Sequence, residues 1–291
     1  MDVTRESQRL AAAHVIQRTS RSVHGPIVRL LSPSDSGQRL KPFVFLDGFE
    51  ADMRALATVF TEGDMTFDDP TGGRGGLGYG GVETVRAGRG TWHGKELSAG
   101  ASRTVQGFQL WIGLQPTMEN TEPEAQYVGG EQIPTADPAY LIVGAYGRAT
   151  SPVRAPNDIN YFLGTLTDGE SCEYDPPPGH LVRWVALAKG APAVGERLSE
   201  GELVILETTD ASISFVNAGG AGATFVLGSA VPSPYELHVG AFSVHTSEDA
   251  LAVGERNIRQ LKQRLTLLAI DAPDPVPGPC SVLFTFLRNS T

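Results

Sequence analysis

The sequence is poor in cysteine, in long apolar runs and in positive charge, and each shortage excludes a class of protein. Cys172 and Cys280 are the only cysteines and stand far apart, so they form neither a zinc-binding spacing nor a redox CxxC motif, and we interpret them as free thiols. No stretch reaches the roughly 18 apolar residues that indicate a membrane span. The opening residues, MDVTRESQRL, lack the apolar run of a signal peptide, which predicts a cytoplasmic protein.

The charge balance is acidic, with 23 Lys and Arg residues against 33 Asp and Glu residues and a net charge of −10. Such a chain has no overall attraction for nucleic-acid phosphates, so neither a nucleic acid nor a membrane is an expected partner. Apolar residues make up 41% of the chain, which is ample for a folded core.

Turn-forming residues recur roughly every 8–12 positions, and the runs between them alternate apolar and polar residues. In the stretch 107–114, Phe108, Leu110 and Ile112 fall on one face of a strand, whereas Gln109 and Trp111 fall on the other. The pattern predicts an all-β sandwich or barrel protein. Further strands are expected at residues 42–49, 58–67, 139–147, 160–171, 180–190, 202–208, 212–219 and 223–230.

Two segments, 43–114 and 160–228, repeat one plan of strands and glycine-containing turns, and the polar stretch PTADP at 134–138 separates them. We therefore predict two β domains, at residues 1–135 and 136–265.

A single amphipathic helix is predicted at residues 246–265, on the outside of a barrel, because Leu251, Ile258 and Leu261 form an apolar stripe. No structure is predicted for the proline-rich tail 266–291, and its apolar run at 281–287 has no obvious partner.

Motifs of catalysis are weak throughout the chain. GRGGLG at 73–78 has the spacing of a phosphate-binding loop, but DDPT precedes it and strand-like GVETVR follows, so we expect a flexible loop between strands. No G-x-S-x-G motif is present. The acidic pairs Asp68-Asp69 and Glu248-Asp249 fit a turn and a helix start. No catalytic or cofactor-binding residue is predicted.

Among the six histidines, His14, His24, His238 and His245 are expected to be hydrogen-bonding or surface residues, and the role of His180 stays open. For His238 and His245 we assume a single extended strand, which places them on opposite faces.

His93 differs from the other histidines, because it follows the glycine-rich turn AGRG and stands three positions before Glu96. A mononuclear iron site needs three or four convergent ligands of these types, and this stretch offers two at most.

Several segments carry a resemblance to a known family. They are PFVFLDGF (42–49), RAGRGTWHGKE (86–96), QGFQLWIGL (106–114), SPVRAPNDINY (151–161) and ELHVGAFSVHTSEDAL (236–251). The chain resembles the pirin family, whose members are proteins of two tandem cupin domains, or jelly-roll β-barrels. The resemblance implies an N-terminal cupin that holds one iron through a His-x-His pair, a later His and a Glu, and a C-terminal cupin that usually binds no metal.

Only part of that ligand set can be carried over to this chain. The later histidine of the family falls on His93, and its glutamate falls on Lys95, which leaves Glu96 as a substitute shifted by one place. The interval 47–63, DGFEADMRALATVFTEG, contains no histidine and is shorter than the pattern of the family. His93 and Glu96 are thus residual metal-ligand candidates, and Fe²⁺ is an expected cofactor only if the site is functional.

We therefore predict a pirin-like bicupin with an absent or degraded metal site, acting as a small-ligand-binding or regulatory protein. Its expected partner is a small molecule in the N-terminal barrel or a regulatory protein partner. The alternative is an iron-dependent oxygenase of the quercetin 2,3-dioxygenase type, which an intact His-x-His pair would favour.

Overall fold

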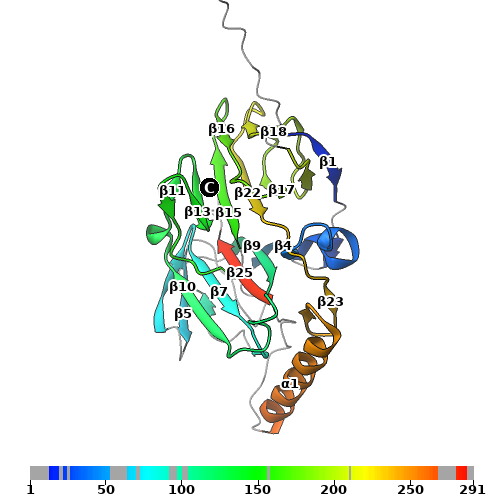
Figure 1. Ribbon diagram of the computed structural model, residues 1–291. Helices are drawn as coiled ribbons and strands as arrows, with labels where there is room; N and C mark the ends of the chain where they lie inside the picture. The colour runs from blue at the N-terminus through cyan, green and yellow to red at the C-terminus, as the bar shows by residue number, and fades with distance from the viewer. Residues whose placement is uncertain are drawn as a thin grey trace, which may run out of the picture.

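The computed structural model describes residues 13–19, 22–24, 27–52, 64–69, 73–91, 97–99, 104–155, 158–209, 211–267 and 280–286. In this part of the chain strands dominate, and a single α-helix, α1 (Glu248–Leu267), follows most of them. Two β units lie one above the other, with α1 beside the lower unit (Figure 1). No helix within the described ranges is long and apolar enough to cross a membrane. The cytoplasmic location stays a prediction.

Each unit is built on a seven-stranded antiparallel sheet. The sheet of the first unit runs, in spatial order, β10 (Glu124–Val128), β7 (Val82–Arg86), β25 (Cys280–Phe286), β9 (Thr104–Gly113), β4 (Phe43–Asp52), β3 (Ile27–Leu31) and β2 (Ser22–His24). The sheet of the second unit runs β1 (Val15–Arg18), β20 (Leu203–Leu206), β17 (Val182–Lys189), β22 (Ala223–Ala230), β15 (Ile159–Leu166), β12 (Ala139–Val143) and β11 (Thr135–Ala136).

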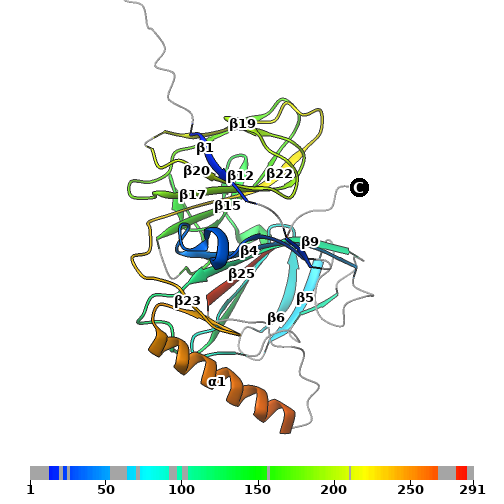
Figure 2. The same ribbon diagram turned by 90° about the vertical axis from the view of Figure 1, so that its right-hand side faces the viewer.

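Smaller sheets cover the outer side of each large sheet (Figure 2). In the first unit this sheet is β6 (Gly73–Gly78), β5 (Asp64–Asp69) and β8 (Leu97–Ala99), and in the second it is β16 (Ser171–Tyr174), β21 (Ile213–Val216), β18 (Ala193–Val194) and β19 (Glu196–Arg197). Two hairpins, β13 (Ala145–Tyr146) with β14 (Ala149–Thr150) and β23 (His238–Val239) with β24 (Val244–His245), and the helical turns η1 (Pro33–Gly37) and η2 (Gly130–Gln132) complete the described elements.

The glycine-rich segment 73–78 is a strand and not the flexible loop that we expected. As β6 it pairs along its whole length with β5, from Gly73 opposite Asp69 to Gly78 opposite Asp64. Tertiary pairing thus overrides the low strand propensity of glycine. A strand follows this segment, so the rejection of a phosphate-binding loop stands.

The largest core lies between the two seven-stranded sheets. Trp184 of β17 is completely buried there, and the ring of Phe43 meets it edge-on, with ring centroids 5.3 Å apart. Leu110 and Ile112 of β9 belong to the same core, as the alternation in the sequence predicts. A second core fills the inside of the second unit, where Phe215 and Phe225 stack with centroids 4.2 Å apart. The first of these two cores is therefore shared by both units, and the other belongs to the second unit.

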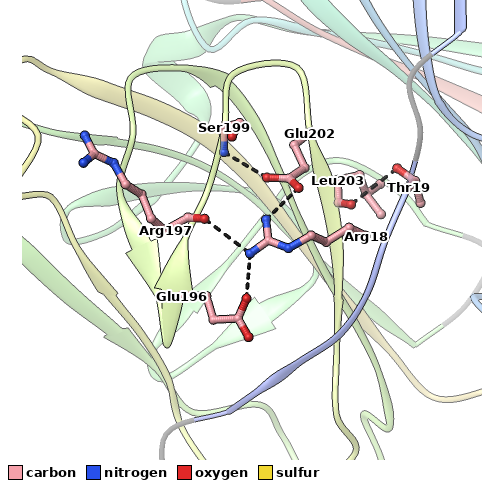
Figure 3. A network of polar contacts seen from close by, with 7 residues as sticks. All are labelled: Arg18, Thr19, Glu196, Arg197, Ser199, Glu202 and Leu203. Carbon is pink, nitrogen blue, oxygen red and sulfur yellow. Dashed lines mark hydrogen bonds and ion pairs between the residues drawn. The ribbon is translucent and has the colours of Figure 1, made fainter.

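The N-terminal strand β1 crosses over to the second unit, where it pairs with β20. Arg18 fastens it there, because its guanidinium donates to Glu202 Oε1 at 2.6 Å, Glu196 Oε2 at 2.8 Å and the carbonyl of Arg197 at 3.3 Å (Figure 3). These two hydrogen-bonded carboxylates raise the pKa of Arg18 above its ordinary value.

The C-terminal strand β25 crosses in the opposite direction and lies between β9 and β7 of the first unit. The apolar run at 281–287, for which the sequence suggested no partner, thus supplies a strand with a partner on each side. The division at residues 135 and 136 stays a prediction, and β11 spans that point as an edge strand of the second sheet.

Helix α1 packs on the outside of the first unit, where we expected it. Glu248 and Asp249 occupy its first turn, where their negative charges interact favourably with the positive end of the helix dipole. Ile258 is buried against the turn that contains Gly90, where an added Cβ would come within 2.8 Å of Ile258. Glu255 also accepts hydrogen bonds from the Phe242 amide at 2.8 Å and the Ser243 hydroxyl at 3.0 Å. These contacts anchor α1 to the turn at Gly90 and to the segment that contains Phe242 and Ser243.

Candidate functional site

The two residual metal-ligand candidates, His93 and Glu96, lie outside the described residues, and their role stays a prediction. Strands β3, β4 and β9 are neighbours in the first sheet. Leu46 and Leu110 point into the core between the two units. Because side chains alternate along a strand, Asp47 and Trp111 lie on the opposite face, toward the smaller sheet of the same unit.

Two aromatic side chains lie on the face of the first sheet that points toward the smaller sheet of the same unit. Phe45 of β4 meets Trp111 of β9 edge-on, with centroids 5.1 Å apart. Trp111 is only 5% exposed, and its indole Nε1 has no hydrogen-bond partner among the described residues.

Arg29 and Asp47 form an ion pair on the same face, because their strands place them directly opposite each other. Arg29 donates from Nε to Asp47 Oδ1 at 2.7 Å and from Nη2 to Oδ2 at 2.8 Å. These hydrogen bonds raise the pKa of Arg29, although burial acts in the other direction. The guanidinium also lies 4.7 Å above the ring of Phe45, which is a cation–π distance. Both oxygens of the buried carboxylate thus accept a hydrogen bond from Arg29.

An open cleft of about 530 Å³ adjoins this ion pair. Its lining combines three serine hydroxyls, one carboxylate, one guanidinium, one aromatic side chain and two aliphatic side chains: Ser22, Arg29, Ser32, Pro33, Ser34, Asp35, Phe45 and Val239. The volume lies in the range of sites for small organic molecules. We name these eight residues the Arg29 cleft.

The described donors of the first barrel do not fit an iron ion. No group of three or more His, Cys, Asp or Glu residues in the described part of the chain could hold a metal. Asp47 is held bidentately by Arg29, and each of its carboxylate oxygens accepts one hydrogen bond from the guanidinium. A mononuclear iron site of the facial type needs three convergent His and carboxylate ligands. The absent or degraded iron site stays a prediction, because His93 and Glu96 lie outside the described residues.

The second unit contains a buried polar cluster that sequence reasoning missed, except for His180. Tyr174 Oη lies 2.6 Å from Ser229 Oγ and accepts a hydrogen bond from Asn160 Nδ2 at 3.1 Å. His180 Nδ1 lies 2.8 Å from the same Ser229 hydroxyl, and its Nε2 lies 3.3 Å from Asp158 Oδ1. The chain of hydrogen bonds leads from the exposed Asp158 to the buried Asn160.

The hydrogen-bonded series Ser229, His180 and Asp158 invites a comparison with a nucleophilic triad. The cluster is nevertheless structural. Ser229 is completely buried, so no substrate carbonyl can approach its hydroxyl. Burial raises the pKa of Tyr174 to about 12, so its phenol keeps its proton further into the alkaline range than an exposed tyrosine does. Asn160 and Ser229 are polar residues within apolar strands, and this is the signal that could have revealed the cluster. That they lie opposite each other follows only from the register of β15 against β22, which the sequence does not show.

His238 and His245 do not share one extended strand, and our assumption for them was wrong. They lie directly opposite each other in the hairpin of β23 and β24. The His245 side chain is fully buried, and its Nδ1 lies 3.8 Å from Glu119 Oε2. Burial favours the neutral form of Glu119, but its contacts with His245 and Thr246 outweigh burial and lower its pKa. His245 is a packing residue beneath α1.

Two barrels whose large sheets pack face to face define the class of a bicupin. The family model described as Pirin matches residues 51–112 of this chain. A pirin-like protein of Solanum lycopersicum is 32% identical over 202 residues, which cover 64% of this chain and 68% of that protein. The chain therefore belongs to the pirin family.

Solved structures agree with this fold. A quercetin 2,3-dioxygenase from Acinetobacter baumannii superposes with a TM-score of 0.74 at 20% identity, over 87% of this chain and 98% of that one. The bacterial pirin YhhW from Escherichia coli, in complex with nickel(II), superposes with a TM-score of 0.55 at 15% identity, over 74% and 96% of the two chains. The prediction of an all-β fold of two tandem cupin barrels with a C-terminal helix is confirmed.

Proposed function

We propose that this pirin-family protein binds a small organic molecule at the first barrel without a catalytic metal, and that binding serves a regulatory role. The Arg29 cleft carries the proposal: it combines a volume of about 530 Å³, the ring of Phe45, a guanidinium held in place by Asp47, and three serine hydroxyls. An aromatic ligand with hydroxyl groups would stack on Phe45 and exchange hydrogen bonds with the serines.

The chemistry of the described donors supports binding over turnover. Asp47 accepts both of its hydrogen bonds from Arg29 and is only slightly exposed, so it is a poor general base. No histidine occurs in the interval 47–63, where the resemblance would place two ligands. A barrel that binds a small molecule without a reaction can still act by changing its contacts with another protein. The proposal therefore includes a regulatory protein partner.

Quercetin is a suitable probe, because a structural neighbour is a quercetin 2,3-dioxygenase. Binding would be measured by quenching of tryptophan fluorescence, before and after treatment with EDTA. We expect saturable binding that EDTA does not change. Phe45→Leu should weaken it about tenfold, equivalent to about 1.4 kcal/mol. Tyr146→Leu, a comparable aromatic truncation in the second unit, should leave it unchanged.

Elemental analysis and oxygen uptake separate binding from oxygenation. The protein would be loaded anaerobically with Fe²⁺ beside a His93→Ala sample. Iron near one per chain that disappears in the variant, together with quercetin-dependent oxygen uptake, would replace the proposal with the oxygenase. An absence of saturable quercetin binding would remove flavonol-like molecules as the ligand class.

A further inference from the structure

The position of β25 in the first sheet becomes clear when the two large sheets are compared. Read from one edge, the order β2-β3-β4-β9-β25-β7-β10 matches β11-β12-β15-β22-β17-β20-β1. Strand β25 therefore occupies the position that β17 holds in the second unit. We name this position, between β7 and β9, the central slot.

The two units fill this position from different parts of the chain. In the second unit, β17 comes from the segment between β15 and β20, as does β16 of the smaller sheet. The matching strands β4 and β7 enclose β5 and β6, and the described residues there supply no counterpart of β16 or β17. The C-terminal strand thus stands in the first unit where the second unit has a local strand.

Backbone pairing on both sides holds β25 in the central slot. It lies antiparallel to β9 from Cys280 opposite Gly113 to Phe286 opposite Gly107. It also lies antiparallel to β7 from Ser281 opposite Arg86 to Thr285 opposite Val82. The facing strands carry buried residues, so an empty slot would leave backbone N–H and C=O groups without partners in the interior.

We propose that the central slot is a strand-binding site, which takes an extended peptide antiparallel to both β7 and β9, and that residues 280–286 of this chain are its ligand. The proposal is independent of the Arg29 cleft. Recognition comes from the two rows of backbone hydrogen bonds, as in other cases of strand insertion. The segment CSVLFTF suits the slot because it has no proline or charge and is rich in residues that favour strands.

The covalent link from α1 through residues 268–279 makes this ligand intramolecular, which raises its effective concentration. A strand held by backbone pairing and not by local chain connection can leave the slot and be replaced by the same segment added in trans. A second copy of the chain can donate it in the same way.

A cleavable full chain tests the site directly. A protease site placed within residues 268–279 would be cut after folding, and the product separated by size-exclusion chromatography. We expect the fragment that contains residues 280–286 to elute with the rest of the protein, and to be displaced only by an excess of the same peptide. A fragment that separates at once, while the remainder keeps its melting temperature, would overturn the proposal.

A proline substitution tests the slot without cleavage. Leu283→Pro removes a backbone N–H in the middle of β25, whereas Asn289→Pro changes a residue beyond its end. A fluorescent peptide of residues 278–288 should bind the Leu283→Pro chain at least tenfold tighter than the wild-type or Asn289→Pro chain, where the tethered strand competes. Equal binding by all three chains would refute the site. If Leu283→Pro does not fold, the cleavage experiment decides.

Discussion

A single buried charge, Asp47, shows how strongly the fold depends on one pairing. Its carboxylate is 4% exposed and receives two hydrogen bonds from Arg29. Asp47→Ala would leave the Arg29 charge partly buried without its partner, so we expect the free energy of unfolding to fall by about 2 kcal/mol. Chemical denaturation measures this change.

A matched exposed pair provides the control for Asp47. Glu196 is 60% exposed and pairs with Arg18, so Glu196→Ala should change the free energy of unfolding by less than about 1 kcal/mol. Equal losses in the two variants would show that burial of the Arg29 pair contributes nothing.

Tyr174 predicts a dependence of stability on alkaline pH. Its pKa is about 12 in the fold, whereas the unfolded chain should lose this proton near 10. The raised pKa means that the folded state binds the proton more tightly, so this contribution is complete below pH 10 and is lost as the pH rises toward 12. The difference in free energy of unfolding between wild type and Tyr174→Phe cancels the other titrating groups. In denaturation experiments this difference should shrink by about 1 kcal/mol between pH 9 and 11. A difference that stays constant would contradict the buried phenol.

At the scale of strands and helices, the sequence is informative where one segment carries its own pattern. The alternation of 107–114 placed Leu110 in a core and Trp111 on the other face, and the apolar stripe of 246–265 placed α1 outside a barrel. Strands β6 and β25 were missed because their strand conformation depends on pairing with other strands. Glycines in β6 show no alternation, and the two neighbours of β25 lie far away in sequence. Non-local pairing of this kind leaves no local signal.

Helix α1 offers a substitution whose effect runs against helix propensity. Ala in place of Gly inside a helix ordinarily stabilises by about 1 kcal/mol. At Gly254, however, an added Cβ would come within 2.2 Å of His245 Nε2, which is fully buried. Gly254→Ala should therefore destabilise the protein by about 2 kcal/mol, measured by thermal or chemical denaturation.

A second substitution isolates the steric cause at Gly254. In the double variant with His245→Ala the Cβ has room, so Gly254→Ala should become neutral or stabilising in that background. Destabilisation of equal size in both backgrounds would show that contact with the imidazole is not the cause.

At the scale of the whole molecule, the ends of the chain tie the two units together. Strand β1 closes an edge of the second sheet, and β25 lies inside the first, so each unit contains a strand from the far end of the sequence. The main core also belongs to both units, since it joins Phe43 and Leu110 of one to Trp184 of the other. The exchange of these two strands therefore ties each unit to a distant part of the sequence.

The shared core predicts that the two barrels unfold together. Trp184 is completely buried between the sheets, and the approach of Gly228 to its indole ring leaves no room for a Cβ, which would lie 2.3 Å away. Trp184→Ala should lower the free energy of unfolding by about 4 kcal/mol, because it removes the largest side chain of that core. In calorimetry we expect wild type and variant each to show one transition, with the calorimetric enthalpy equal to the van't Hoff enthalpy, shifted to lower temperature in the variant. Two separate transitions, of which Trp184→Ala moves only the one from the second unit, would mean that the interface does not couple the barrels.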